Sequence, residues 1–106
     1  MRFTIAIHGG AGTILRKEMT PELEKRYVLA LQESLDAGYK ALLAGKSAID
    51  AVVASVIALE DNVLFNAGKG SVFNSEGQHE MDAALMDGSN LMAGAVTGVR
   101  NIRNPI

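Results

Sequence analysis

The side chains best suited to chemistry in this chain of 106 residues lie in one polar stretch, residues 59–88. They are Asn62, Asn66, Asn74, Asp82 and Asp87. Amide and carboxylate groups orient substrates through hydrogen bonds, and their oxygens ligate hard cations. A long polar loop between apolar elements is more often functional than merely connecting. We therefore place the candidate site in this stretch.

Several common catalytic and nucleotide-binding motifs fail on spacing. A zinc-protease motif starting at His79 needs a second histidine at position 83, which is Ala83. A phosphate-binding loop containing Lys69 needs Ser or Thr next, and Gly70 follows instead. The glycine-rich dinucleotide fingerprint needs a glycine at position 15, which is Leu15, and no G-x-S-x-G elbow of esterases occurs. These four kinds of site are excluded.

Two carboxylates, Glu80 and Asp82, are spaced to share one face of a strand. Two interpretations are open: a functional carboxylate pair, or a polar strand face. The second is the more common arrangement, because most charged residues on proteins are simply solvated.

The apolar segment 48–59 ends without an ordinary helix cap. Glu60 and Asp61 stand where the helix dipole is negative, and the next cation in the sequence is Lys69. No glycine or basic residue caps the last carbonyl oxygens. Either water satisfies them, or a hard cation is bound by main-chain oxygens.

Composition indicates a single globular domain. The chain is 48% hydrophobic and 21% charged, which excludes a disordered chain, and its net charge of -2 favours neither nucleic acid nor an anionic membrane as a partner. Cysteine is absent, so disulfides and thiolate metal sites are excluded. The apolar run that precedes His8 is too short for a signal peptide. We expect a cytoplasmic location.

The first half of the sequence predicts one strand and two helices. Residues 3–7 alternate and are β-branched, as in a strand. Thr20 and Pro21 start a helix that Gly45 ends, and Ser47 starts a second helix with a capping box. The first helix has an apolar face formed by Leu23, Tyr27, Leu31, Leu35 and Leu42. The second is apolar all round, which predicts burial between a sheet and other helices.

The second half predicts strands and turns, which makes the fold class α+β. Residues 71–73 are a possible short strand and residues 74–77 a turn. Residues 80–87 and 93–99 are predicted to pair as antiparallel strands, with Met81, Ala83 and Leu85 on one face. Residues 104–106 show no capping pattern.

Six short motifs, in order, resemble those of the plant-type asparaginases, also called isoaspartyl peptidases. They are His8-Gly9-Gly10-Ala11-Gly12, Leu64-Phe65-Asn66-Ala67-Gly68-x-Gly70, Met81-Asp82-Ala83, Met86-Asp87-Gly88, Gly94-Ala95-Val96 and Arg103-Asn104-Pro105. Each motif alone is weak, whereas together they are specific and span nearly the whole chain.

This resemblance implies an N-terminal nucleophile hydrolase with a four-layer αββα sandwich. The family cleaves itself into α and β subunits and frees a threonine that attacks the substrate amide while its own amine acts as base. That threonine lies in a Gly-Thr-Val-Gly motif, which this chain lacks. We therefore expect residues 1–106 to be the N-terminal portion of a single asparaginase-like domain, part of the α subunit, with no catalytic nucleophile of its own.

The resemblance also implies a structural sodium ion and one supporting side chain. The family's sodium loop uses main-chain oxygens at the positions of Leu59, Glu60, Asn62, Phe65, Ala67 and Lys69. Asn66 corresponds to an asparagine that lies against the nucleophilic threonine. The expected partners are the β subunit, in a dimer of αβ heterodimers, and a small-molecule or dipeptide substrate.

The function expected from the resemblance is hydrolysis of the β-amide of L-asparagine and of β-aspartyl peptides. Two alternatives remain. One is a glycosylasparaginase-type amidase, which the lack of a signal peptide disfavours. The other is a noncatalytic interaction module whose glycine-rich loops only pack.

Overall fold

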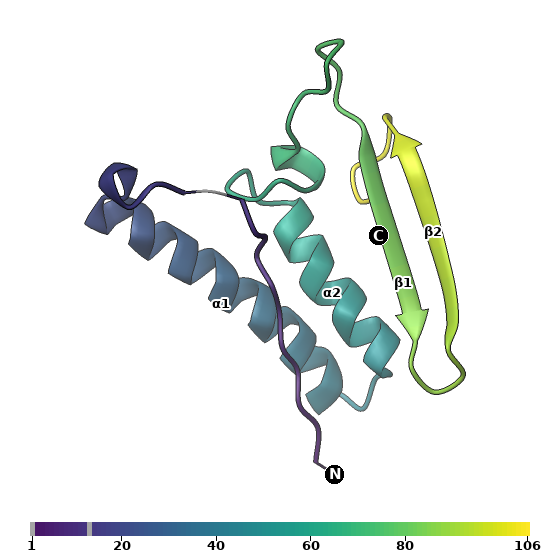
Figure 1. The fold of residues 1–106 in the computed structure, drawn as a ribbon. Helices are drawn as coiled ribbons and strands as arrows, with labels where there is room; N and C mark the ends of the chain where they lie inside the picture. The colour runs from purple at the N-terminus through teal and green to yellow at the C-terminus, as the bar shows by residue number, and fades with distance from the viewer. Residues whose placement is uncertain (1, 13) are drawn as a thin grey trace.

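The computed structural model describes residues 2–12 and 14–106. It contains two helices, α1 (Pro21–Leu43) and α2 (Ala48–Glu60), followed by a hairpin of β1 (Met81–Asp87) and β2 (Met92–Val99) (Figure 1). Two single-turn helices, η1 (Arg16–Glu18) and η2 (Gly68–Gly70), lie in the connections. The α+β class is confirmed.

Helix α1 starts and ends where its local sequence predicts. The Thr20 Oγ1 atom accepts a hydrogen bond from the Leu23 N–H at 3.1 Å, and Pro21 occupies the first helical position. Gly45 follows the C-cap residue with a φ of 76°, a left-handed conformation that costs glycine nothing.

Small residues are the most deeply buried part of the contact between the two helices. Ala30, Ser34 and Gly38 are the buried residues of α1, whereas its leucine face is only half-buried. Ser34 Oγ donates to the Ser55 carbonyl at 2.9 Å, and Ser55 Oγ donates back to the Ser34 carbonyl at 2.8 Å. A Cβ at Gly38 would lie 2.3 Å from Ser55 Oγ, so only glycine permits this close helix packing.

Helix α2 lies between α1 and the hairpin, as predicted for an apolar helix (Figure 1). The Ser47 capping box is confirmed, because Ser47 Oγ accepts from the Asp50 N–H while Asp50 Oδ2 accepts from the Ser47 N–H, both at 3.1 Å. Burial all round is wrong, however. Val52 is 39% exposed, because no further element of the described chain covers that side.

The strand predicted over residues 3–7 is not formed. Residues 3–7 alternate between half-buried and exposed, and Ile5 packs beside Gly38. They form no ladder, since none of the described segments pairs with their backbone. The alternation that suggested a strand thus reflects packing on the helices, where Phe3 contacts Tyr39 edge to face at a ring distance of 5.3 Å.

The antiparallel hairpin is confirmed, and its inward face carries Met81, Ala83 and Leu85. Residues 71–73 are not a strand; only an isolated bridge joins Phe73 to His79. The turn that follows is confirmed, since Asn74 Oδ1 accepts hydrogen bonds from the N–H groups of Glu76 and Gln78, both at 2.9 Å.

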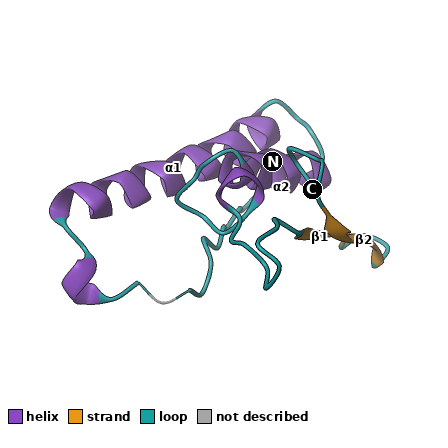
Figure 2. Ribbon diagram, turned by 90° about the horizontal axis from the view of Figure 1, so that it is seen from above, coloured by secondary structure: helices purple, strands orange, loops and turns teal. Residues whose placement is uncertain are grey.

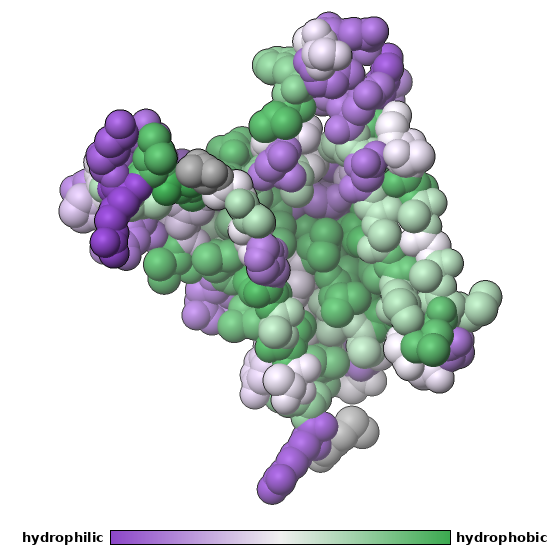
Figure 3. All heavy atoms as spheres, in the orientation of Figure 1, coloured by the Kyte–Doolittle hydropathy of each residue, from purple (hydrophilic) through white to green (hydrophobic). Residues whose placement is uncertain are grey.

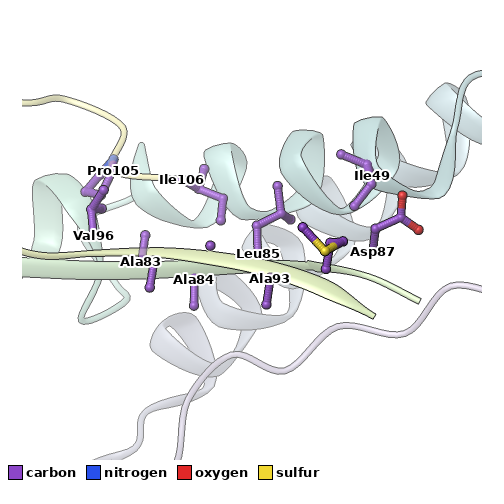
Figure 4. A pocket seen from close by; sticks show the side chains of 12 residues that line it. Ile49, Ala83, Ala84, Leu85, Asp87, Ala93, Val96, Pro105 and Ile106 are labelled. Atoms are coloured by element: carbon purple, nitrogen blue, oxygen red, sulfur yellow. The ribbon is translucent and has the colours of Figure 1, made fainter. Parts of the chain in front are cut away.

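A cavity of about 350 Å³ separates the hairpin from α2. Leu85 and Ile49 point into it from opposite sides, whereas Ala84 points away (Figure 4). The chain returns here after β2, so that Pro105 and Ile106 line the same cavity. The inward face of the hairpin is therefore covered incompletely.

The surface is unusually large and apolar. It measures 7883 Å², against about 5,700 Å² expected for a folded chain of this mass. Leu91 and Met92 are each 70% exposed, and apolar residues cover the middle of the face in Figure 3. The described part of the chain has one helical layer beside one two-stranded sheet (Figure 2). No helix in it has the length and apolarity needed to cross a membrane.

Candidate functional site

The loop of residues 61–70 links the end of α2 to the hairpin region and contains most of the predicted site residues. Backbone hydrogen bonds between residues two or three positions apart shape its turns. The Asn62 N–H donates to the Leu59 carbonyl at 3.2 Å, and the Ala67 N–H donates to the Phe65 carbonyl at 2.9 Å. The Gly70 N–H then donates to the Ala67 carbonyl at 3.0 Å. We call this segment the 61–70 loop.

Two glycines let this loop fold back on the helix end. A Cβ at Gly68 would lie 2.5 Å from the Glu60 carbonyl oxygen, and one at Gly70 would lie 2.2 Å from that of Phe65. Such distances are impossible for real side chains, so both positions require glycine. The result is a compact turn in which the carbonyl oxygen of Glu60 lies against Gly68 and that of Phe65 lies against Gly70.

Asn66 is exposed, and one of the two polar atoms of its side-chain amide is hydrogen-bonded within the described residues. Its Oδ1 atom accepts a hydrogen bond from the Val72 N–H at 3.0 Å, which fixes the side-chain orientation. Within the described residues its Nδ2 donates to no protein group. The loop-stabilising role is thus observed, and the amide nitrogen is left available as a donor.

The His8–Gly12 motif lies beside Asn66, which the sequence alone did not indicate. Both line a cavity of about 680 Å³ whose floor is Tyr27, Leu31 and Phe65. A Cβ at Gly9 would be 2.8 Å from Leu31 and 3.2 Å from Phe65, so the motif packs directly on that floor. The sequence did not predict this position, because the fold alone brings residues 8–12 to the 61–70 loop.

The remaining residues that line this cavity are also mostly apolar or glycine. They are Ile14, Met19, Leu59, Leu64 and Ala67, beside Gly10, Ala11 and Gly12 of the motif itself. Such a hollow, with Asn66 at its edge, matches the usual form of a small-molecule site: an apolar lining with few polar groups.

The carboxylates at the end of α2 have partners that the sequence did not predict. Arg103 donates from Nε to Asp61 Oδ1 at 3.1 Å, and Asn104 Nδ2 donates to the same oxygen at 3.1 Å. These bonds, that of Asn104 foremost, hold the pKa of Asp61 below its ordinary value. Arg103, which is distant in sequence, therefore reaches the carboxylate next to the helix end, and the bonds from residues 103–106 go to the Glu60 and Asp61 side chains and not to the last carbonyl oxygens of α2.

Glu80 and Asp82 do not form a carboxylate pair. Arg100 donates to Glu80 and lowers its pKa. Asp82 Oδ1 accepts from the Gly98 N–H and from Thr97 Oγ1, both at 2.8 Å, which lowers the pKa of Asp82. Each carboxylate has its own partner on β2 or just beyond it, so the polar-face interpretation holds.

His79 and Asp87 are likewise occupied by local contacts. His79 Nδ1 lies 3.2 Å from Ser71 Oγ, and its ring packs on Phe73. Asp87 Oδ1 accepts from the Ser89 N–H at 2.8 Å, and bonds from Ser89 lower the Asp87 pKa. No three His, Cys, Asp or Glu side chains of residues 2–12 and 14–106 cluster as a metal site would require.

The chain belongs to the asparaginase family, since a family model described as asparaginase matches residues 1–106. The isoaspartyl peptidase of Salmonella typhimurium is 53% identical over 102 residues, which are 96% of this chain and 33% of that protein. The isoaspartyl peptidase of Escherichia coli is 52% identical over 96% of this chain and 32% of its own length. The plant-type L-asparaginase of Thermococcus kodakarensis is 49% identical, with the same two coverages of 96% and 32%. The chain thus spans about a third of the length of these relatives.

Proposed function

We propose that this chain supplies the N-terminal third of an isoaspartyl peptidase/L-asparaginase that hydrolyses the β-amide of L-asparagine and of β-aspartyl peptides. The observation that carries the proposal is Asn66, fixed by Val72 at the edge of the cavity beneath the His8–Gly12 motif. Its relatives bear the names isoaspartyl peptidase and plant-type L-asparaginase.

In this proposal the nucleophile comes from a β subunit of the same precursor. A threonine freed by self-cleavage attacks the substrate carbonyl carbon, and its own α-amine takes the hydroxyl proton. The amine passes that proton to the departing ammonia or peptide amine, and water then hydrolyses the acyl-enzyme ester to release the acid and restore the threonine. The Asn66 Nδ2 group, which has no protein acceptor in the described chain, donates a hydrogen bond to that threonine. Because Oδ1 is held by Val72, the donor is oriented before substrate arrives, and preorganised donors contribute strongly to catalysis.

The rest of the architecture follows from the same proposal. The hairpin and the helices form part of a four-layer αββα sandwich whose other layers come from residues outside this chain. Such layers would cover the exposed apolar surface described above. The functional unit is then a dimer of αβ heterodimers in the cytoplasm.

The experiment is Asn66→Ala in the complete protein, with Asn74→Ala as the matched control. Both asparagines accept backbone N–H bonds through Oδ1, but only Asn66 lies at the cavity. We expect Asn66→Ala to lower kcat by roughly 10²-fold, the usual cost of losing a preorganised donor. Asn74→Ala should leave kcat unchanged. Equal effects of the two substitutions on turnover would reduce Asn66 to a loop residue.

A sodium ion fits the 61–70 loop as a structural partner. The expected ligands are the main-chain oxygens of Leu59, Glu60, Asn62, Phe65, Ala67 and Lys69. The fit rests on the cradle at Gly68 and Gly70, which any Cβ would fill. At this cradle, the main-chain carbonyl oxygen of Glu60 accepts no hydrogen bond from a backbone N–H of the described residues that follow α2. When bound, the ion supplies positive charge to carbonyl dipoles at the negative end of a helix.

Replacing sodium chloride by choline chloride at equal ionic strength tests this role. We expect the melting temperature of the complete protein to fall by several degrees, since a bound ion stabilises the folded state by mass action. Choline is too large for an oxygen cradle of this kind. A melting temperature that is identical in the two salts would rule out a sodium site.

A further inference from the structure

Glu60 has a buried carboxylate that the proposed function does not use. Its residue is 3% exposed, although it ends a helix at the negative pole of the dipole. Burying a carboxylate is costly unless hydrogen bonds replace its water. Here the replacements are neutral: Asn104 Nδ2 at 3.4 Å from Oε1 and the Ile106 N–H at 3.2 Å from Oε2. The adjacent Asp61, in contrast, takes the charged Arg103.

Glu60 also touches the loop that contains Asn66. A Cβ built on Gly68 would lie 2.9 Å from the Cα atom of Glu60, 2.6 Å from its Cβ atom and 2.5 Å from its carbonyl oxygen. The Gly68 backbone therefore packs directly against Glu60. Glu60 and Asn66 line one cavity of about 330 Å³, which Pro105 and Ile106 also line. One residue therefore joins the helix end, the 61–70 loop and the segment that returns after β2.

We propose that Glu60 is a positioning residue: its carboxylate fastens residues 104–106 to the end of α2, and the resulting clamp fixes the 61–70 loop and the Asn66 side chain. The consequence for catalysis rests on the role of Asn66 proposed above. The clamp itself does not, because it is defined by hydrogen bonds and by the contact with Gly68.

The other acids around this cavity do not make it a cation site. Glu80 is paired with Arg100, and Asp82 is held by Thr97 and Gly98. Glu60 in turn has two donors. Since each carboxylate already has protein donors as partners, fastening of the chain is the role that the contacts support.

The experiment compares Glu60→Ala and Glu60→Gln with Asp61→Asn in the complete protein. The readouts are kcat, KM and hydrogen exchange of the Val72 amide, whose acceptor is Asn66 Oδ1. The Gly98 amide, bound by Asp82 in the hairpin, is the internal reference for overall stability. Asp61→Asn is the matched control, since Asp61 is the neighbouring carboxylate, binds the same returning segment and is less buried.

We expect Glu60→Ala to lower kcat by roughly 10-fold to 10²-fold with KM nearly unchanged, since a misplaced group outside the substrate contacts affects the transition state most. Glu60→Gln should lose less, because glutamine keeps the volume and one acceptor. Protection of the Val72 amide should fall by about 10-fold in Glu60→Ala, with no matching fall at Gly98. Asp61→Asn keeps an oxygen acceptor for Asn104 and loses mainly the charge opposite Arg103, so we expect its effects on kcat and on the Val72 amide to be clearly smaller than those of Glu60→Ala.

Two results would overturn the proposal. One is unchanged Val72 exchange in Glu60→Ala; the other is an equal loss of protection at Val72 and Gly98, which indicates general destabilisation. If Asn66→Ala is fully active while Glu60→Ala still releases Val72, the clamp stands and only its catalytic consequence is wrong. The two failures are therefore distinguishable.

Discussion

The isolated chain of 106 residues should release no ammonia from L-asparagine and cleave no β-aspartyl dipeptide. The reaction proposed here needs a threonine that carries both the attacking hydroxyl and a free α-amine. No Gly-Thr-Val-Gly motif, in which the family's nucleophile lies, occurs in residues 1–106. The expected loss of activity relative to the complete protein is total.

The threonines that the structure describes are placed for other roles. Thr20 caps α1, and Thr97 Oγ1 donates to Asp82 within the hairpin. Thr4 is exposed in the N-terminal segment, away from Asn66 in sequence and outside the lining of its cavities. The fourth, Thr13, lies outside the described residues. None of the four lies in a Gly-Thr-Val-Gly motif.

The measurement is ammonia release at several concentrations of the purified chain, with the self-cleaved complete protein as positive control. Steady release that scales with chain concentration, and that survives repeated purification, would contradict the expectation. It would also remove the reason for placing the nucleophile on a separate subunit.

The parts of the fold that the sequence predicted are those fixed within a few residues. The Thr20 and Ser47 caps and the Asn74 turn each depend on hydrogen bonds spanning two to four positions. The left-handed Gly45 likewise follows from its own conformational freedom. Such features depend on local chemistry alone, so a single sequence is enough to place them.

The errors concern elements that depend on distant partners. Residues 3–7 have a strand pattern, but a β-ladder also needs a neighbouring strand, which the described chain does not supply. The contact between α1 and α2 includes reciprocal hydrogen bonds of Ser34 and Ser55, 21 positions apart, which the apolar pattern of α1 did not predict. A hydrophobic pattern shows which residues avoid water; it does not show which small residues allow two backbones to approach.

In the candidate site, too, the features that depend on distant partners could not be predicted from the sequence. Asn66 was selected because it lies in the motif of residues 64–70 that resembles the plant-type asparaginases. Arg103 and Asn104 were not assigned to the carboxylates at the end of α2, since more than forty positions separate them from Asp61. The position of the His8–Gly12 motif beside Asn66 is likewise a property of the fold alone.

The second large effect is expected for Gly68→Ala, compared with Gly77→Ala. Both glycines adopt left-handed backbone, with φ of 50° and 73°. A Cβ at Gly77 meets nothing within 4 Å, whereas one at Gly68 would overlap the Glu60 main chain at 2.5 Å. The left-handed conformation costs alanine about 1–2 kcal/mol at either site. The overlap adds about 1–3 kcal/mol at Gly68 alone, because the obstacle is helix backbone that cannot rotate away.

We expect Gly68→Ala and Gly77→Ala to differ more in kcat than in the free energy of unfolding. Relief of the overlap at Gly68 moves the 61–70 loop away from the end of α2, and Asn66 lies two residues earlier in that loop. We therefore expect kcat of the complete protein to fall by about 10²-fold in Gly68→Ala, as for other small displacements of a positioned group. Gly77→Ala should retain kcat, since its turn lies at Asn74, outside the cavities that Asn66 lines. Urea midpoints give the stability difference, and turnover at a temperature where both variants are folded gives kcat. A Gly68→Ala protein that is folded and fully active would show that the close contact between Glu60 and Gly68 is not needed to place Asn66.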